Sequence, residues 1–578
     1  MENGSQLGKQ PAALRFGAAG HLLRASTLGG LLPVVAIIVG LLPIWAVRYV
    51  PLYDYQNHLL EAQVVARYAD PALRYSQEYL IREGWYLHSN ALATLLMIGA
   101  GRLVPMEAAG KLVLSLYVVL SIGGLAALLD AAGRPRRLLL AAPILVYNLT
   151  FTTGMLNWCL GFALAIWSLL AYVRWQRQGD PQLLAALAGL LLLIYTAHVL
   201  AWGLCVAVLF GVAAADRLPA RRMLLLGAAL SGAAPLLALS RPLLALAPAL
   251  IGAGLWSAGA AIRRLRLGWT TVAAIGAAAA GTYLGAWRAL KPELLARFPD
   301  VDYSLNSKLV AVPRLFTLPH QLFPIDRSLV VVNVALLALV GSTAALLAAS
   351  CLIGRRQAPE ARWLAPIGVL AFGYVVIPTR TLDIIVTEPR LLLMACVVGL
   401  LAAPPVRAGR LANALLAALV LLALVSSGAT LVYARRYDAV AQRWADTLRA
   451  IPPAQSVLVL ANPPTFTRDG WHTLARLSQV LDGNQFSGTY ALERGGFISN
   501  TFFNGPLLPR QPAAIPPYWW VDYRPAAFVS QRCAELRPVY GYVVVWNPGD
   551  QELAQELGGC YDALAPHASQ LAIWKGRQ

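Results

Sequence analysis

Residues 51–67, PLYDYQNHLLEAQVVAR, directly follow the first long apolar run of the chain, 28–50. Asp54, His58 and Glu61 are spaced four and three residues apart, so a helix would carry them on one face. Ionisable side chains at a membrane boundary are costly unless they are paired or used. The stretch therefore predicts a helix at the membrane surface that carries either a functional site or a satisfied capping cluster.

The composition indicates a membrane protein. The chain has 578 residues, of which 58% are hydrophobic and 13% are charged, too few to cover the surface of a soluble protein of this size. Many separate apolar segments of roughly 17–25 residues predict a polytopic α-helical membrane protein. Most of the net charge of +19 lies in short Arg-rich loops, which set orientation, so we expect no nucleic-acid partner.

Basic loops fix the expected topology, because cytoplasmic loops carry an excess of Lys and Arg. The loop around Arg134, Arg136 and Arg137 is the first such landmark, and a tail of residues 1–27 is expected on the same side. About thirteen transmembrane helices follow within residues 28–434, an odd number that places the C-terminal region outside. They are expected at 28–50, 110–131, 138–153, 157–174, 182–197, 199–215, 223–240, 243–262, 269–288, 329–353, 363–378, 389–405 and 411–434.

One apolar segment, 87–104, conflicts with this count, because it is long enough to cross. A crossing there would move every later basic loop to the outer face. The segment also contains His88, Asn90 and two glycines. We therefore expect an amphipathic or re-entrant helix inside a first outer loop, 51–109.

Polar residues gather in the other expected outer loops. They are Asn157, His198, Lys308, Arg380, Glu388 and Arg390. His198 alone would suit a satisfied residue of the helix bundle, and Glu388 with Arg390 would equally suit a structural ion pair at the start of a helix.

Residues 435–578 predict a small α/β domain on the outer face. Strands are expected at 456–461, 540–546 and 571–575, and helices at 439–450, 471–481 and 551–557. Cys533 and Cys560 both lie in this region. An oxidising outer compartment would permit a disulfide between them, but the spacing leaves the pairing open.

The layout resembles the GT-C class of membrane glycosyltransferases, with one span, a long first outer loop that starts with an acid, a helical bundle and an outer C-terminal domain. The chain also resembles a largely uncharacterised group of bacterial membrane proteins. The shared patterns are D-Y-x-N-H at 54–58, Y-N-x-x-F-x-x-G at 147–154 and G-x-x-N-[YW] at 154–158. Several GT-C members carry a second acid in the next outer loop, where this chain has Asn157, so a two-acid metal site made from those loops is in doubt.

The resemblance implies transfer of a sugar from a polyprenyl-phosphate donor to an acceptor hydroxyl of a glycan, lipid or protein. Asp54 would be the general base, with His58 and Glu61 orienting it. Arg390 is the first choice for binding the donor phosphate, before Arg380 and Lys308. Further residues expected to line the substrate pocket are Tyr53, Asn57, Asn157, His198 and Glu388. Whether the reaction uses a metal ion is left open. The ion would be Mg²⁺ or Mn²⁺, with Asp54 and Glu61 as its ligands.

Two other functions compete. A transporter or lipid flippase would place ionisable residues at mid-membrane and show internal repeats, whereas here they lie at the outer boundary and no repeat is evident. A non-catalytic subunit of envelope polysaccharide assembly is the third hypothesis. Usage rich in Ala and Arg suggests a bacterium, which would make the location the inner membrane and the outer compartment the periplasm.

Overall fold

The structure is a computed structural model in which thirteen parts of the chain are described. They are residues 16–217, 315–316, 327–353, 361–376, 380–381, 384–385, 387–403, 409–461, 486–500, 506–510, 525–546, 551–564 and 571–577. The predicted spans 223–240, 243–262 and 269–288 lie outside these residues, as do the predicted helix 471–481 and Lys308.

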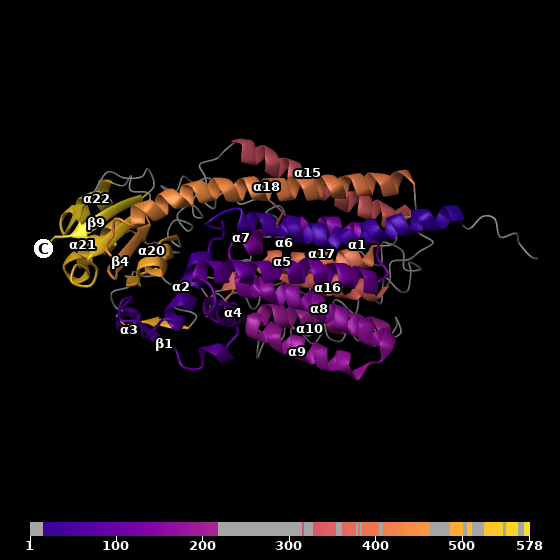
Figure 1. Cartoon of the computed structure of the whole chain (residues 1–578), viewed down its shortest axis with the longest axis horizontal. Coiled ribbons are helices and arrows are strands. Elements are labelled where there is room, and N and C mark those ends of the chain that lie inside the picture. The colour runs from indigo at the N-terminus through magenta and orange to yellow at the C-terminus, as the bar shows by residue number, and fades with distance from the viewer. Residues whose placement is uncertain are drawn as a thin grey trace, which may run out of the picture.

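Long apolar helices pack side by side along the longest axis of the molecule (Figure 1). Within the described chain they are α1 (Phe16–Trp45), α5 (Met106–Ala131), α8 (Leu156–Gln178), α9 (Pro181–Ala197), α10 (Val199–Arg217), α15 (Arg327–Ile353), α16 (Ala361–Val376), α17 (Thr387–Ala402) and α18 (Arg410–Leu448). Helix α8 lies at the centre, with α5, α9 and α10 packed around it. Most of its first eighteen residues are buried.

Three of the described helices are long and apolar enough to cross a membrane: α5, α8 and α18. Several others, among them α9 and α17, are apolar but shorter. The chain is thus mostly helical with several candidate membrane helices, and the count of about thirteen spans stays a prediction.

The predicted span 138–153 is wrong as a continuous helix. The chain there forms three short pieces, η3 (Arg136–Ala141), α6 (Ala142–Val146) and α7 (Leu149–Thr152). The cause is Asn148, whose side-chain oxygen accepts the backbone N–H groups of Thr150 and Phe151 and so starts a new helix. All of α6 is buried, so this irregular backbone is enclosed by protein.

The first outer loop folds into short elements rather than a second span. They are α2 (Tyr55–Ala66), α3 (Tyr75–Glu78), β1 (Tyr79–Ile81), η2 (Trp85–Leu87) and α4 (Leu92–Gly101). With ten residues, α4 is about 15 Å long, half the thickness of a bilayer core. Its length therefore agrees with the prediction that 87–104 does not cross.

Helix α18 joins the bundle to the C-terminal domain without a break. Its 39 residues correspond to about 58 Å. In Figure 1 it runs along the whole bundle and ends against the strands of that domain. The helix predicted at 439–450 is its continuation, and the expected boundary at 434/435 falls inside it.

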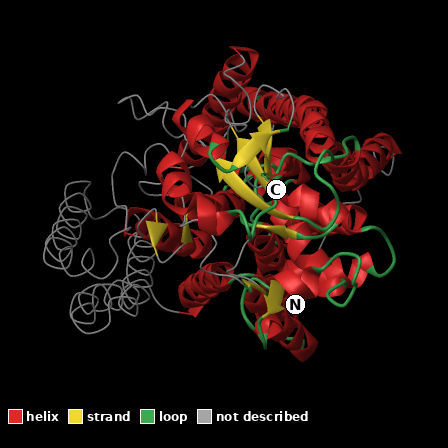
Figure 2. Cartoon of the chain, turned by 90° about the vertical axis from the view of Figure 1, so that its left-hand side faces the viewer, coloured by secondary structure: helices red, strands yellow, loops and turns green. Residues whose placement is uncertain are grey.

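The C-terminal domain contains a mixed five-stranded sheet in the order β5-β4-β7-β9-β8. The strands β5 and β7 run parallel to β4, and β9 runs antiparallel to β7 and β8. The strands are β4 (Ser456–Ala461), β5 (Phe497–Ile498), β7 (Tyr542–Trp546), β8 (Tyr561–Ala563) and β9 (Leu571–Gly576); the helices are α20 (Gly488–Arg494), α21 (Pro525–Leu536) and α22 (Gln551–Gly558). The predicted strands are therefore confirmed, as is the helix at 551–557. Figure 2 shows the sheet from the C-terminal side of the molecule.

A disulfide joins Cys533 on α21 to Cys560 after α22, with 6.2 Å between the Cα atoms. The sequence left this pairing open.

The first outer loop and the C-terminal domain are paired directly. Strand β1 is antiparallel to β6 (Leu507–Pro509), with Leu80 opposite Leu508. The side chain of Glu78 accepts a hydrogen bond from the Ser456 hydroxyl at 3.0 Å. Segments more than 370 residues apart in the sequence thus form one layer above the helix ends.

Candidate functional site

Two sequence motifs meet at Asp54. The backbone N–H groups of Tyr53 and Asp54 donate to the carbonyls of Thr152 and Thr153 at 3.1 and 3.2 Å. Next along the chain is Gly154, whose φ is +78°; a Cβ there would lie 2.6 Å from the Asp54 nitrogen. Only glycine fits this position, because it tolerates positive φ and has no Cβ to clash. The D-Y-x-N-H and G-x-x-N-W segments are therefore held against each other by backbone contacts.

The Asp54 side chain is left free by this arrangement. Asp54 is the N-cap residue of α2, yet its carboxylate makes no capping hydrogen bond, and no other partner for it occurs among the described residues. Burial raises the pKa of the Asp54 carboxyl to about 7, His58 lowers it and Glu61 raises it. A carboxyl that ionises near neutral pH suits a general base.

His58 and Glu61 lie one and two turns further along α2. His58 Nδ1 is 3.5 Å from Glu61 Oε2, and the Glu61 side chain is almost fully buried. Burial opposes the charged imidazole, but Glu61, Asp54 and the Gly154 carbonyl together raise the pKa of His58. The pair lies within α2, on the turns that follow Asp54. No group of three His, Cys, Asp or Glu side chains suited to a metal ion occurs in the described parts of the chain.

Arg390 lies in the first turn of α17 and is 4% exposed. Its Nη2 donates to the sulfur of Met155 at 2.8 Å, and its guanidinium lies over the Trp158 ring, 5.2 Å from the centroid. Among the described residues its Nε has no partner and no carboxylate pairs with it. Arg390 is thus a buried cation whose described neighbours are neutral, an arrangement that is costly unless an anion joins it.

His198 is the third member of this cluster. It lies between α9 and α10, and its Nδ1 accepts the backbone N–H of Leu200 at 3.1 Å. Its Nε2 is 3.3 Å from Nη1 of Arg390, and the imidazole tautomer decides whether Nε2 accepts a hydrogen bond from the guanidinium. The Trp158 indole, in edge contact with His198, also has an N–H with no partner among the described residues.

The residue pair Gly154–Met155 connects the two halves. Gly154 contacts the backbone of Asp54, and the sulfur of Met155 contacts Arg390. Asp54 and Arg390 therefore flank the same two residues. Arg390 and His198 contact each other, and the Gly154–Met155 segment lies next to both Asp54 and Arg390; the catalytic roles of these residues stay a prediction.

Two other predicted pocket residues have structural contacts. Asn157 accepts the N–H of Ala93 and donates to the carbonyl of Asn90, both at 2.8 Å, which fastens the start of α4 to α8. Asn57 donates weakly to the carbonyl of Asn500 at 3.5 Å and is fully buried against the C-terminal domain.

The remaining candidates are described only in part. Arg380 lies in β2 (Arg380–Thr381), which forms a two-stranded sheet with β3 (Ile384–Ile385), and Glu388 lies in the first turn of α17. Their side chains lie outside the described part, as does all of Lys308. Tyr53 is half-buried beside Asp54.

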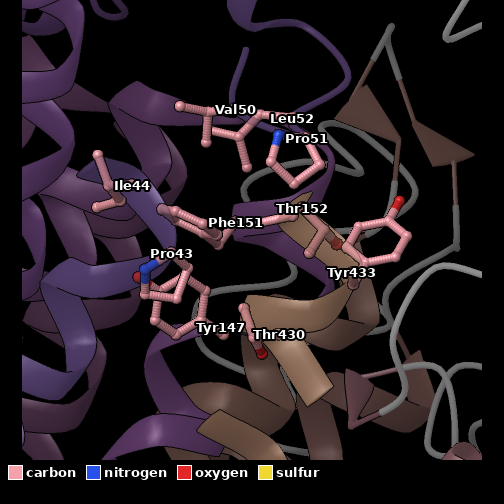
Figure 3. A pocket seen from close by; sticks show the side chains of 11 residues that line it. Pro43, Ile44, Val50, Pro51, Leu52, Tyr147, Phe151, Thr152, Thr430 and Tyr433 are labelled. Atoms are coloured by element: carbon pink, nitrogen blue, oxygen red, sulfur yellow. The ribbon is translucent and has the colours of Figure 1, made fainter. Parts of the chain in front are cut away.

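A small apolar hollow lies next to the site (Figure 3). The segment 50–52, the neighbouring segment 147–152, α1 and α18 form its wall; Leu52 and Thr152 stand two residues before Asp54 and Gly154. The side chains that line it include Pro43, Ile44, Val50, Phe151, Thr430 and Tyr433. No charged side chain lines this hollow.

No family model matches the chain, and no curated protein gives a significant match.

The contacts around Arg390 and His198 were not predicted from the sequence. The aromatic position of the G-x-x-N-[YW] pattern was a signal for Trp158. Met155 and the Leu200 amide gave none, because a methionine in an apolar segment and a backbone N–H cannot be distinguished from their neighbours by type.

Proposed function

We propose that this protein is a membrane glycosyltransferase of the GT-C kind. It moves a sugar from a polyprenyl-phosphate donor to an acceptor hydroxyl of a glycan, lipid or protein at the outer face of the bacterial inner membrane. One observation carries the proposal: Arg390 is a buried cation with no carboxylate partner among the described residues, and its Nε has no hydrogen-bond partner among them. A phosphate oxygen would supply an acceptor for that Nε and a negative charge beside the guanidinium.

The lone guanidinium suits a phosphodiester. A polyprenyl-phosphate sugar carries one negative charge at its phosphate, which matches the one unpaired cation of the described cluster. The disulfide of the C-terminal domain supports an outer location, here the periplasm.

In the proposed reaction, the bond between the anomeric carbon and the phosphate oxygen breaks, and its electron pair stays with the phosphate. Arg390 and His198 stabilise the charge on that oxygen. The acceptor oxygen attacks the opposite face of the sugar, and its proton passes to the Asp54 carboxylate. One displacement with one base inverts the anomeric configuration. His58 and Glu61 are not asked to bind a metal in this scheme; a role for Mg²⁺ or Mn²⁺ stays open.

The test uses the purified full chain in lipid nanodiscs with a panel of polyprenyl-phosphate sugars labelled in the sugar. We expect release of labelled sugar, or its transfer to an added glycan acceptor, with free polyprenyl phosphate as the second product. The matched control is protein with Asp54→Asn. If the label moves between leaflets of proteoliposomes without cleavage, the protein is a flippase; binding without either outcome would indicate a non-catalytic assembly subunit.

A further inference from the structure

The C-terminal domain contacts the same helix turn that follows Asp54. Helix α20 packs against α2. At the contact, a Cβ added to Gly488 would lie 3.0 Å from Asn57 Oδ1 and 3.6 Å from the backbone carbonyl carbon and oxygen of Gln56. A contact of 3.0 Å is tight for a Cβ atom, so a side chain at 488 would press on the Asn57 amide, which would have to shift by a few tenths of an ångström.

Helix α20 is itself held on the first outer loop at its other end. The Tyr75 hydroxyl donates to the Ala491 carbonyl at 2.7 Å, and the N–H of Gly496 donates to the Leu73 carbonyl at 2.8 Å. Gly495, with φ of +74°, approaches Leu73 so closely that a Cβ would lie 2.7 Å from its Cα. These contacts fix the distance at which Gly488 meets α2.

Asn57 connects the Gly488 contact with Asp54 along α2. It lies three residues after Asp54, so the two side chains lie on neighbouring positions of one helix face. Asn57 is fully buried, and its Oδ1 has no hydrogen-bond partner among the described residues. The amide is therefore held by packing against Gly488 and by one long hydrogen bond to Asn500.

We propose that the C-terminal domain positions the base, with Asn57 and Gly488 as the contacting pair. Asn57 is a positioning residue in this scheme and does not touch the substrate. The inference rests on the proposed function for its kinetic consequence, but the docking itself is a property of the folded chain. It assigns the outer domain a role at the reaction centre besides covering the acceptor.

The test compares Gly488→Ala with Gly558→Ala, a glycine of the same domain whose added Cβ meets nothing within 4 Å. We expect Gly488→Ala to lower kcat about five- to tenfold, because displacements well below 1 Å at a reacting group reduce rates strongly. The pH midpoint of the rate should also fall by about half a unit or more, since a shift of Asn57 lets water reach Asp54. Gly558→Ala should leave both unchanged.

A double-mutant cycle separates this contact from general damage. In an Asn57→Ala background the space opposite residue 488 is open, so Gly488→Ala should then cost less than about twofold. Should Gly488→Ala fail to fold, Asn57→Gln extends the amide toward Gly488 and tests the same contact. An equal loss in both backgrounds, or an unchanged pH midpoint, overturns the proposal.

Hydrogen–deuterium exchange of residues 55–66 tests the docking without any substrate. We expect faster exchange in the first turn of α2 with Gly488→Ala but not with Gly558→Ala. If the wild-type chain transfers no sugar, the proposed function fails while this measurement still decides the docking. Exchange that is the same in both variants overturns the positioning role.

Discussion

Charged side chains have opposite surroundings in two regions of the molecule, one at the contact with the C-terminal domain and one in the helix bundle. Toward the C-terminal domain, Glu493 pairs with both Arg48 at 3.2 Å and Arg449 at 3.3 Å, and it accepts a hydrogen bond from Tyr49. Toward the helix bundle, Arg390 is more deeply buried, yet its described neighbours are His198, Met155 and Trp158. The first arrangement is complete without a ligand. The second leaves a buried charge without an anion among the described residues, and the proposed phosphate site rests on this difference.

The largest effect on activity is expected from removing the Asp54 carboxylate. Asp54→Asn keeps the size and hydrogen-bonding capacity of the side chain but cannot take a proton, so transfer should fall about 10³-fold or more. Asp70→Asn is the control, because Asp70 lies on the same loop, more exposed, in an ion pair with Arg67. Initial rates of sugar transfer measure both. A rate for Asp54→Asn within tenfold of wild type would exclude Asp54 as the base.

Arg390→Gln is expected to have the next largest effect. Removing the guanidinium takes away the charge that binds the leaving phosphate, and kcat/KM should fall about 10²-fold. The thermal midpoint in detergent should not decrease, because the wild-type charge has no described anionic partner. A clear loss of stability together with full activity would mean that Arg390 is a structural residue.

Contacts between residues close together in the sequence could be predicted, whereas contacts between residues far apart in the sequence could not. The spacing of Asp54, His58 and Glu61 correctly predicted a helix with neighbouring ionisable groups, and hydropathy predicted α5 and α8 closely. Arg390 and His198 are 192 residues apart, so their contact depends on the packing of α9, α10 and α17, which local patterns do not contain.

Other features that the sequence did not predict have local causes, which a pattern of apolar residues does not reveal. The Asn148 side chain divides the predicted span 138–153 by capping a new helix. The pairing of β1 with β6 joins two three-residue strands, which are too short to give a period-two signal. The continuity of α18 was missed because its composition changes from apolar to charged while its backbone does not change.

The pH dependence offers a third way to sharpen the comparison. Burial raises the pKa of Asp54 to about 7, so the base is protonated and inactive below that pH. The rate should fall about tenfold for each unit below pH 7 and level off above it. Measurements of kcat/KM between pH 5.5 and 8.5 test this with a donor whose phosphodiester does not titrate in the range. A midpoint near 4 would mean that Asp54 is fully hydrated in the working enzyme.

The smallest effect on activity is expected around Glu493. Arg449→Gln removes one partner of Glu493, which Arg48 and Tyr49 still contact. Because such partly exposed pairs contribute about 1 kcal/mol or less, stability should drop slightly and the transfer rate should stay within about twofold. Thermal unfolding and initial rates measure the two. A loss of activity as large as that of Arg390→Gln would remove the distinction between the two regions.

The unbroken course of α18 has a mechanical consequence. A helix of about 58 Å that passes from the bundle into the C-terminal domain behaves as a stiff rod, so a change of about 5° in its tilt displaces its far end by about 5 Å. Tilt responds to the thickness of the surrounding bilayer. The height of the outer sheet above the helix ends is therefore linked to the lipid in which the protein resides.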